Sequence, residues 1–164
     1  MVDAVAPIPV VAAGGIADGR GLAAALALGA AGISMGTRFT ASRESLWDPA
    51  MKAAALKAGG DETMQTRVFD IVRGAPWPAI YPGRGLRNAF SAEWHSREDE
   101  LAARQTEVEK SYLATAPDDF SQRVVWAGES VDLVNDIPTA AEIIERVVAQ
   151  AAATLRQGAR LVKE

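Results

Sequence analysis

Two short apolar runs without polar alternation stand near the start of the chain, and each is followed by glycine. Residues 10–12 precede Gly14 and Gly15, and residues 32–35 precede Gly36. Runs of this kind are typical of parallel strands that are covered on both faces. We therefore expect two strands, with a glycine-bearing turn at the end of each strand.

The segment between the two runs predicts a helix. Asp18 can accept hydrogen bonds from the first free N–H groups of that helix, and Gly29 is a stop signal at its other end. A helical crossover between two strands of one sheet brings the C-terminal ends of both strands to the same side. We therefore expect Gly15 and Gly36 to lie near each other, with backbone N–H groups available to an anion.

Farther along the chain, the pattern predicts one extended segment and one irregular loop. Residues 63–72 are enriched in β-branched and aromatic side chains, which favours a strand. Residues 74–85 hold three prolines and three glycines, which is typical of a loop. We expect the apolar loop residues Trp77, Ile80 and Tyr81 to pack onto the domain.

Helices are expected on either side of that extended segment. Asp48 followed by Pro49 predicts a helix start, because proline suits the first helical position. Residues 91–115 read as helical, with a narrow apolar stripe and a charged outer face. Thr139 with Glu142 forms a capping box at the start of a last long helix.

Composition narrows the functional classes. The 164 residues include 17 Lys and Arg, 21 Asp and Glu and no cysteine, with a formal net charge of −4. No basic stripe is visible, so we expect no nucleic acid partner. No apolar run approaches the roughly 20 residues of a membrane span, and no secretory signal is recognisable, so we expect no membrane partner and a cytoplasmic protein.

Four segments resemble, in order, the nitronate monooxygenase family, whose older name is 2-nitropropane dioxygenase. They are residues 12–16, 18–21, 23–29 and 35–39. The family is built on a (β/α)8 TIM barrel and binds FMN, and its last two barrel strands hold the flavin phosphate. The resemblance implies that the cofactor-binding residues here are Ala13, Gly14, Gly15, Gly36 and Thr37.

The chain is shorter than the roughly 250 residues of a full barrel. We therefore expect an α/β fold that forms the C-terminal part of a larger enzyme, with the missing N-terminal half or self-association as its partner. Residues 1–46 would be the last barrel strands with the FMN phosphate grip. Residues 47–136 would be a small α-rich second domain, and residues 137–164 a C-terminal helix that packs on the barrel.

The resemblance implies an FMN-dependent oxidoreductase that oxidises alkyl nitronates with O2. Two alternatives stay open: a fragment similar to flavin-dependent enoyl-acyl-carrier-protein reductases, and a non-catalytic flavin-binding module. The family's catalytic histidine lies upstream of the two glycines, whereas the single histidine here, His95, lies far downstream. We expect a surface position for His95, no catalytic residue and no metal site in this chain, and no turnover by the chain alone.

Two arginines follow the glycine turns, and each could either contact a phosphate or form an ion pair. Arg20 and Arg38 could add positive charge beside a phosphate. We favour surface ion pairs with nearby acids such as Asp18 or Glu44, because exposed pairs of this kind are common.

Overall fold

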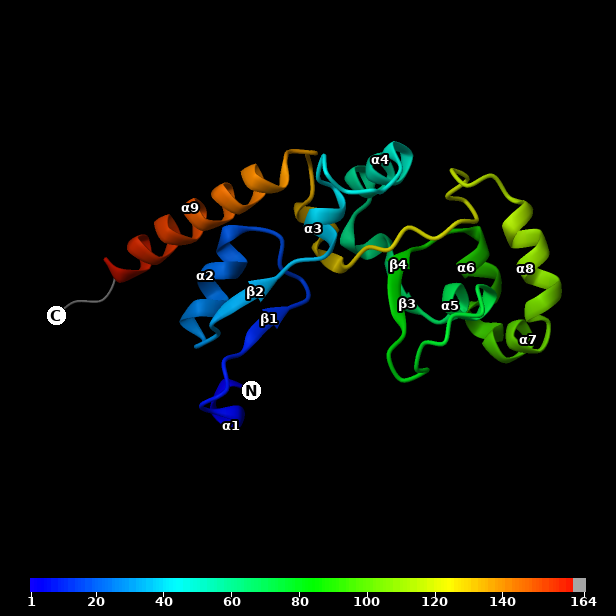
Figure 1. Ribbon diagram of the computed structural model, residues 1–164, viewed down its shortest axis with the longest axis horizontal. Coiled ribbons are helices and arrows are strands. Elements are labelled where there is room, and N and C mark those ends of the chain that lie inside the picture. Colours follow the sequence, from blue (N-terminus) through cyan, green and yellow to red (C-terminus); the bar gives the residue numbers. More distant parts are fainter. Residues whose placement is uncertain (161–164) are drawn as a thin grey trace. The chain divides into compact units, whose positions relative to one another are not determined.

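The computed structural model describes residues 1–160, which divide into two compact units (Figure 1). Unit 1 combines residues 1–47 with the C-terminal segment from residue 130, and unit 2 comprises residues 48–129. The sequence-based boundary places residues 130–136 in the second domain, whereas here they cluster with unit 1. The reason is visible at Asp136, which binds Arg38 of unit 1.

Unit 1 contains a parallel two-stranded sheet with helices before, between and after the strands. The 3-10 helix η3 (Glu129–Leu133) leads into it from unit 2. Its elements are α1 (Val2–Val5), β1 (Val11–Ala13), α2 (Gly19–Ala27), β2 (Gly32–Ser34), α3 (Thr37–Thr40) and α9 (Ala140–Ala159).

The two predicted strands pair as expected. β1 and β2 are parallel, with Val11 opposite Gly32 and Ala13 opposite Ser34. Because the strands run in the same direction, their C-terminal ends meet at one edge of the sheet. The glycines that follow each strand therefore leave the sheet at that shared edge.

The crossover helix α2 begins and ends as predicted. Asp18 Oδ1 accepts hydrogen bonds from the N–H groups of Arg20 (2.9 Å) and Gly21 (3.1 Å). Gly29 has φ of +89°, a backbone conformation that glycine adopts without strain. α2 packs against α9 so closely that a Cβ on Gly19 would lie 2.3 Å from the carbonyl oxygen of Val147.

Unit 2 is mostly helical and contains an antiparallel strand pair. Its strands are β3 (Thr63–Thr66) and β4 (Gly83–Leu86). Its helices are α4 (Pro49–Lys57), η1 (Gly60–Glu62), α5 (Val68–Val72), α6 (Ala89–Trp94), η2 (His95–Arg97), α7 (Glu98–Ala103) and α8 (Gln105–Ala114).

A single apolar core fills unit 2 and is rich in aromatic side chains. Phe69 stacks on Phe90 with ring centroids 5.8 Å apart, and Phe90 lies 5.0 Å from the ring of Tyr112. Pairs of this geometry add stability beyond the area that they bury. The buried cluster is Val68, Phe69, Val72, Phe90, Trp94, Leu101, Val108, Tyr112 and Val124.

The prediction of one extended segment over residues 63–72 is half wrong. The segment is a strand only to Thr66 and then turns into helix α5. Val68, Phe69 and Val72 are all buried. Their i, i+1, i+4 spacing places them on one face of a helical turn, so packing overrides the strand preference of β-branched residues.

The loop prediction for residues 74–85 holds only in part. Its last residues form β4, and Trp77, Ile80 and Tyr81 do not pack onto the domain, since they are 60%, 77% and 61% exposed. The Trp77 indole N–H donates instead to the carbonyl of Tyr81. The loop therefore closes on itself, with its apolar side chains pointing outward.

Both predicted helix starts are confirmed. Asp48 Oδ1 accepts a hydrogen bond from the N–H of Ala50, with Pro49 at the first position of α4. Thr139 and Glu142 form the reciprocal capping box of α9, with Glu142 Oε2 2.7 Å from the Thr139 nitrogen. Residues 91–115 are helical but broken into α6, η2, α7 and α8. Within residues 1–160, no helix combines the length and the apolar character that a membrane crossing requires.

Candidate functional site

The first glycine turn, which we call tip 1, consists of Gly14 and Gly15 directly after β1. Their φ angles are +89° and +69°. Residues that carry a Cβ rarely adopt this backbone conformation, so the turn itself requires glycine. A Cβ placed on either residue would meet no atom of residues 1–160 within 4 Å, so this part of the chain leaves the turn open on that side.

The second turn, tip 2, consists of Gly36 and Thr37 at the start of α3. Gly36 has φ of −92° and ψ of −73°, which any residue can adopt. Among the residues that the structure describes, a Cβ on Gly36 would also meet no atom within 4 Å. Neither backbone conformation nor packing within the described residues therefore calls for glycine at position 36. What glycine leaves there is free space beside the main chain.

The strand register brings the two tips to one edge of the sheet. Ala13 lies opposite Ser34, and each tip begins one or two residues farther on. Residues 1–160 also form backbone hydrogen bonds that belong to no helix and no strand pair. None of these is donated by the N–H group of Gly14, Gly15 or Gly36. Neighbouring N–H groups in such turns form anion-binding concavities. The residues predicted to bind the cofactor thus follow two strands that end at the same edge of the sheet.

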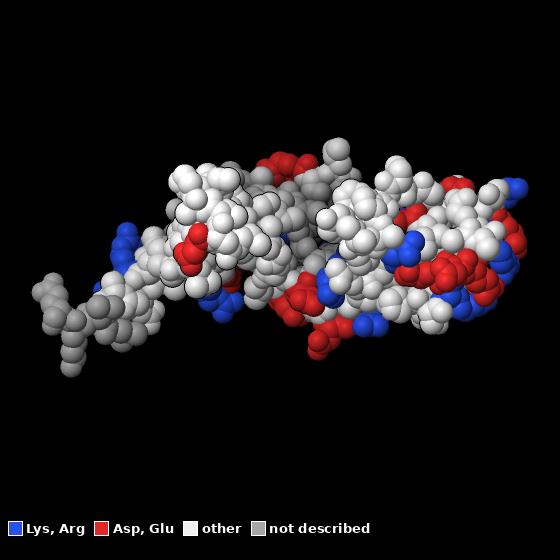
Figure 2. Space-filling view, turned by 90° about the horizontal axis from the view of Figure 1, so that it is seen from below, with Lys and Arg blue, Asp and Glu red and all other residues white. Residues whose placement is uncertain are grey.

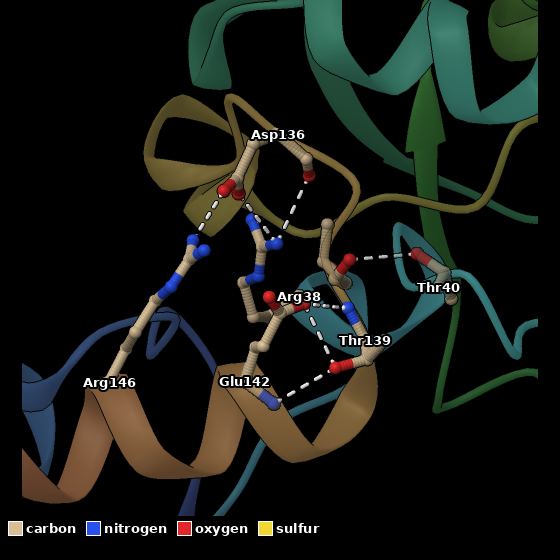
Figure 3. Close-up of polar contacts among 7 residues, drawn as sticks. Arg38, Thr40, Asp136, Thr139, Glu142 and Arg146 are labelled. Carbon is tan, nitrogen blue, oxygen red and sulfur yellow. Dashed lines mark hydrogen bonds and ion pairs between the residues drawn. The ribbon is translucent and has the colours of Figure 1, made fainter.

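The two arginines behave differently. Arg20 forms the expected exposed pair, with Nε 2.6 Å from Asp18 Oδ2. The expectation for Arg38 is wrong: its side chain is only 6% exposed, and Nη2 lies 2.8 Å from Asp136 Oδ1 and 3.1 Å from the Asp136 carbonyl oxygen (Figure 3). Asp136 is 98 positions away in sequence, so no local pattern indicates this pair.

Asp136 also binds the last helix of unit 1. Its Oδ2 lies 2.6 Å from Nη1 of Arg146 in α9 (Figure 3). Burial acts to raise the pKa of the Asp136 carboxyl, but hydrogen bonds and charge from Arg146 and Arg38 outweigh it, so this pKa is lowered. A cavity of about 160 Å³ adjoins the network, and its polar lining comprises Asp18, Arg38, Asn135, Asp136, Arg146 and Gln150.

His95 lies on the surface of unit 2, as expected. It is exposed in η2, with Nδ1 3.1 Å from the Thr66 hydroxyl. Glu98 accepts a hydrogen bond from the N–H of Arg67 at 3.0 Å. Among residues 1–160, no group of three or more histidine, aspartate or glutamate side chains is arranged to hold a metal ion.

Charged side chains of both signs form ion pairs at α7 and α8 of unit 2. In Figure 2, acidic and basic side chains lie interspersed on the part of unit 2 that carries α7 and α8. Arg104, for example, pairs with both Glu100 (3.3 Å) and Glu107 (2.8 Å). The face in view offers no continuous basic stripe of the kind that binds nucleic acid.

A family model, curated proteins and solved structures all match most of this chain. The family model described as "Nitronate monooxygenase" matches residues 1–150. Nitronate monooxygenase of Neurospora crassa is 35% identical over 145 residues, which cover 85% of this chain and 37% of that protein. An indene-carboxyl-CoA dehydrogenase of Mycobacterium tuberculosis is 34% identical over 197 residues, covering 99% of this chain and 56% of that protein.

Solved structures agree with the sequence matches. The structure of FabK from Thermotoga maritima aligns with a TM-score of 0.77 and 35% identity, over 94% of this chain and 48% of that one. The chain therefore spans between about a third and somewhat over half of the length of these relatives.

Proposed function

Because the chain belongs to the nitronate monooxygenase family, we propose that unit 1 supplies the phosphate-binding end of an FMN site. The observation that carries this proposal is the free space at Gly36, where the described fold does not require a glycine. A ligand that approaches the main chain closely is a direct reason to have one there. Tip 1 lies at the same edge of the sheet.

The residues at this edge suit a phosphate dianion. Gly14, Gly15 and Gly36 offer main-chain N–H groups, and Ala13 and Thr37 complete the set that the family resemblance implies. Backbone donors from two converging turns bind phosphate without placing a charged side chain against it. Arg38 is not needed for this, since Asp136 already engages its guanidinium. When bound, the flavin supplies the electron-transfer chemistry.

For the whole protein, we propose that β1 and β2 are the last two strands of a TIM barrel, with α9 on the barrel wall. A phosphate site after the last two strands is common in such barrels. The relatives extend well beyond the matched region, so the remaining strands and a catalytic histidine would come from sequence outside this chain. The proposed reaction is oxidation of a small alkyl nitronate with O2.

One alternative uses the same phosphate site for different chemistry. The likeness to FabK lends some support to flavin-dependent enoyl reduction. The coenzyme A ester in the name of the mycobacterial relative also indicates that acyl thioesters occur among the substrates of similar proteins. The family model and the nitronate monooxygenase relatives favour nitronate oxidation. A flavin-binding module without catalysis is the third candidate.

The phosphate grip is tested by comparing FMN with riboflavin, which lacks the phosphate. The full polypeptide encoded by the gene that contains this chain is titrated with each flavin, and quenching of flavin fluorescence gives the two dissociation constants. Several charge-assisted hydrogen bonds predict that FMN binds about 100-fold more tightly, or more. Equal affinities for the two flavins would contradict the proposed phosphate site.

A second experiment separates the candidate reactions. The flavin-loaded polypeptide is mixed without oxygen with an alkyl nitronate and, separately, with a reduced nicotinamide. Bleaching of flavin absorbance by the nitronate, followed by O2 consumption when air is admitted, supports nitronate oxidation. Bleaching only by the nicotinamide supports enoyl reduction, and bleaching by neither supports the non-catalytic module.

A further inference from the structure

The helix α9 and the segment just before it contact the elements that follow both tips. Gln150 of α9 accepts a hydrogen bond through Oε1 from the N–H of Gly19, the first residue of α2, at 2.8 Å. Asp136, just before α9, binds Arg38 of α3. α2 follows tip 1 and α3 begins within tip 2, so one C-terminal segment is bonded to both sides of the candidate site.

The ion pair of Asp136 with Arg38 links the C-terminal segment to tip 2, and its Arg38 side chain is buried. Asp136 presents one carboxylate oxygen to Arg38 and the other to Arg146, at 2.8 and 2.6 Å, as Figure 3 shows. Arg38 comes two residues after Gly36, and its guanidinium is almost completely buried. A buried guanidinium is costly without its partner, so the positions of Arg38 and Asp136 are coupled.

The link to tip 1 depends on close packing. A Cβ on Gly19 would lie within 2.6 Å of the Ala151 nitrogen, so the start of α2 touches the main chain of α9. Gln150 adds a hydrogen bond at this contact and occupies the first free N–H of the helix. Rotation or sliding of α2 relative to α9 would break both features.

We propose that Asp136 and Gln150 are positioning residues of the phosphate site. Neither residue contacts the ligand. They hold the two tips at the separation in which donors from both turns reach the same phosphate, which is the preorganisation that a tight binding site requires. This inference rests on the proposed function, and it assigns to the C-terminal segment a role in binding as well as in folding.

The test measures the preference for FMN over riboflavin in Asp136→Asn and Gln150→Ala. We expect each substitution to reduce this preference about tenfold, because the donors no longer converge, while the affinity for riboflavin changes less than about twofold. Gln150→Glu keeps an acceptor for the Gly19 N–H and should restore most of the preference. The 31P resonance of bound FMN should move in the two impaired variants and stay in place in Gln150→Glu.

Glu107→Gln in α8 is the matched control, since it breaks an exposed carboxylate–arginine pair in unit 2. It should leave the preference unchanged. Thermal melting of each variant separates lost stability from lost binding.

The outcomes distinguish the two proposals. If the unsubstituted protein binds both flavins equally, the proposed function fails. If it prefers FMN and both impaired variants keep that preference within twofold, the positioning role is overturned and the phosphate site survives. Should Asp136→Asn fail to fold, Gln150→Ala alone decides, because it removes only a neutral acceptor.

Discussion

In unit 2, the buried side chains of α5, α6, α7 and α8 meet in one core that contains stacked aromatic rings. In unit 1, the buried apolar side chains are small or aliphatic, among them Ala23, Val147 and Ala151, while Val11 of β1 is 59% exposed. Distant segments of unit 1 are joined instead by polar links such as that from Arg38 to Asp136. The aromatic core and the candidate site therefore lie in different units.

The largest effect is expected from the core of unit 2. Phe69 is fully buried and contacts the rings of Phe90 and Trp126. Phe69→Ala should lower the free energy of unfolding by about 3–5 kcal/mol, because a cavity remains. Urea unfolding followed by tryptophan fluorescence measures this loss. Ile80→Ala, at a side chain that is 77% exposed, is the control and should cost less than about 0.5 kcal/mol. Similar losses for both variants would contradict the proposed core.

The next largest effect is expected in unit 1, where small residues let α2 and α9 pack closely. Gly19→Ala would push a methyl group against the main chain of α9 and should destabilise the protein by about 1–3 kcal/mol. Gly158→Ala, also in a helix but with no atom of residues 1–160 outside its own helix within 4 Å of the added methyl group, should be neutral or stabilising by up to about 1 kcal/mol. Thermal melting compares the two, and equal melting temperatures would show that α2 and α9 are not in such contact.

A smaller effect concerns acid pH. The pKa values of Asp136 and Glu142 are lowered: burial opposes the shift at Asp136 but Arg146 and Arg38 outweigh it, and the N–H and hydroxyl of Thr139 lower that of Glu142. A lowered pKa means that the unfolded chain binds more protons in acid, so this stability is present at neutral pH. It is lost as the pH falls below the ordinary values of about 4.

Hydrogen exchange, corrected for intrinsic rates, should therefore show the first turn of α9 losing protection in acid before the core of unit 2. If the amides of α5 and α6 lose protection first, the polar links of unit 1 are not the interactions that acid disrupts first.

The smallest effect is expected at the surface of unit 2. Arg104, the residue just before α8, forms an exposed pair with Glu107 of α8, and such pairs contribute little because water and salt screen them. Glu107→Gln should leave the melting temperature almost unchanged and the difference should vanish at high salt. A clear drop that persists in salt would mean that the pair of Arg104 and Glu107 stabilises unit 2.

Local chemistry predicts much of this structure. The glycine turns after β1 and β2, the Asp18 cap and the capping box of Thr139 with Glu142 follow from residue type and spacing, and the structure confirms them. The parallel pairing follows from the crossover rule and is also confirmed. These features depend on interactions within a few residues or on the general handedness of chains.

Features that depend on distant partners escape the sequence. Nothing near Arg38 indicates that Asp136 binds it. The turn from strand to helix after Thr66 depends on a core to which α6, α7 and α8 all contribute. The outward position of Trp77 depends on its hydrogen bond to the Tyr81 carbonyl, which no periodicity reveals.

Gly36→Ala tests whether glycine at position 36 serves a ligand rather than the fold. Thermal melting and the two flavin dissociation constants are measured for this variant, with Gly158→Ala as control. We predict an unchanged melting temperature, since among residues 1–160 the added methyl group meets no atom within 4 Å, together with a loss of FMN preference over riboflavin of about tenfold or more. A variant that keeps the full preference for FMN would contradict a ligand role for glycine at position 36.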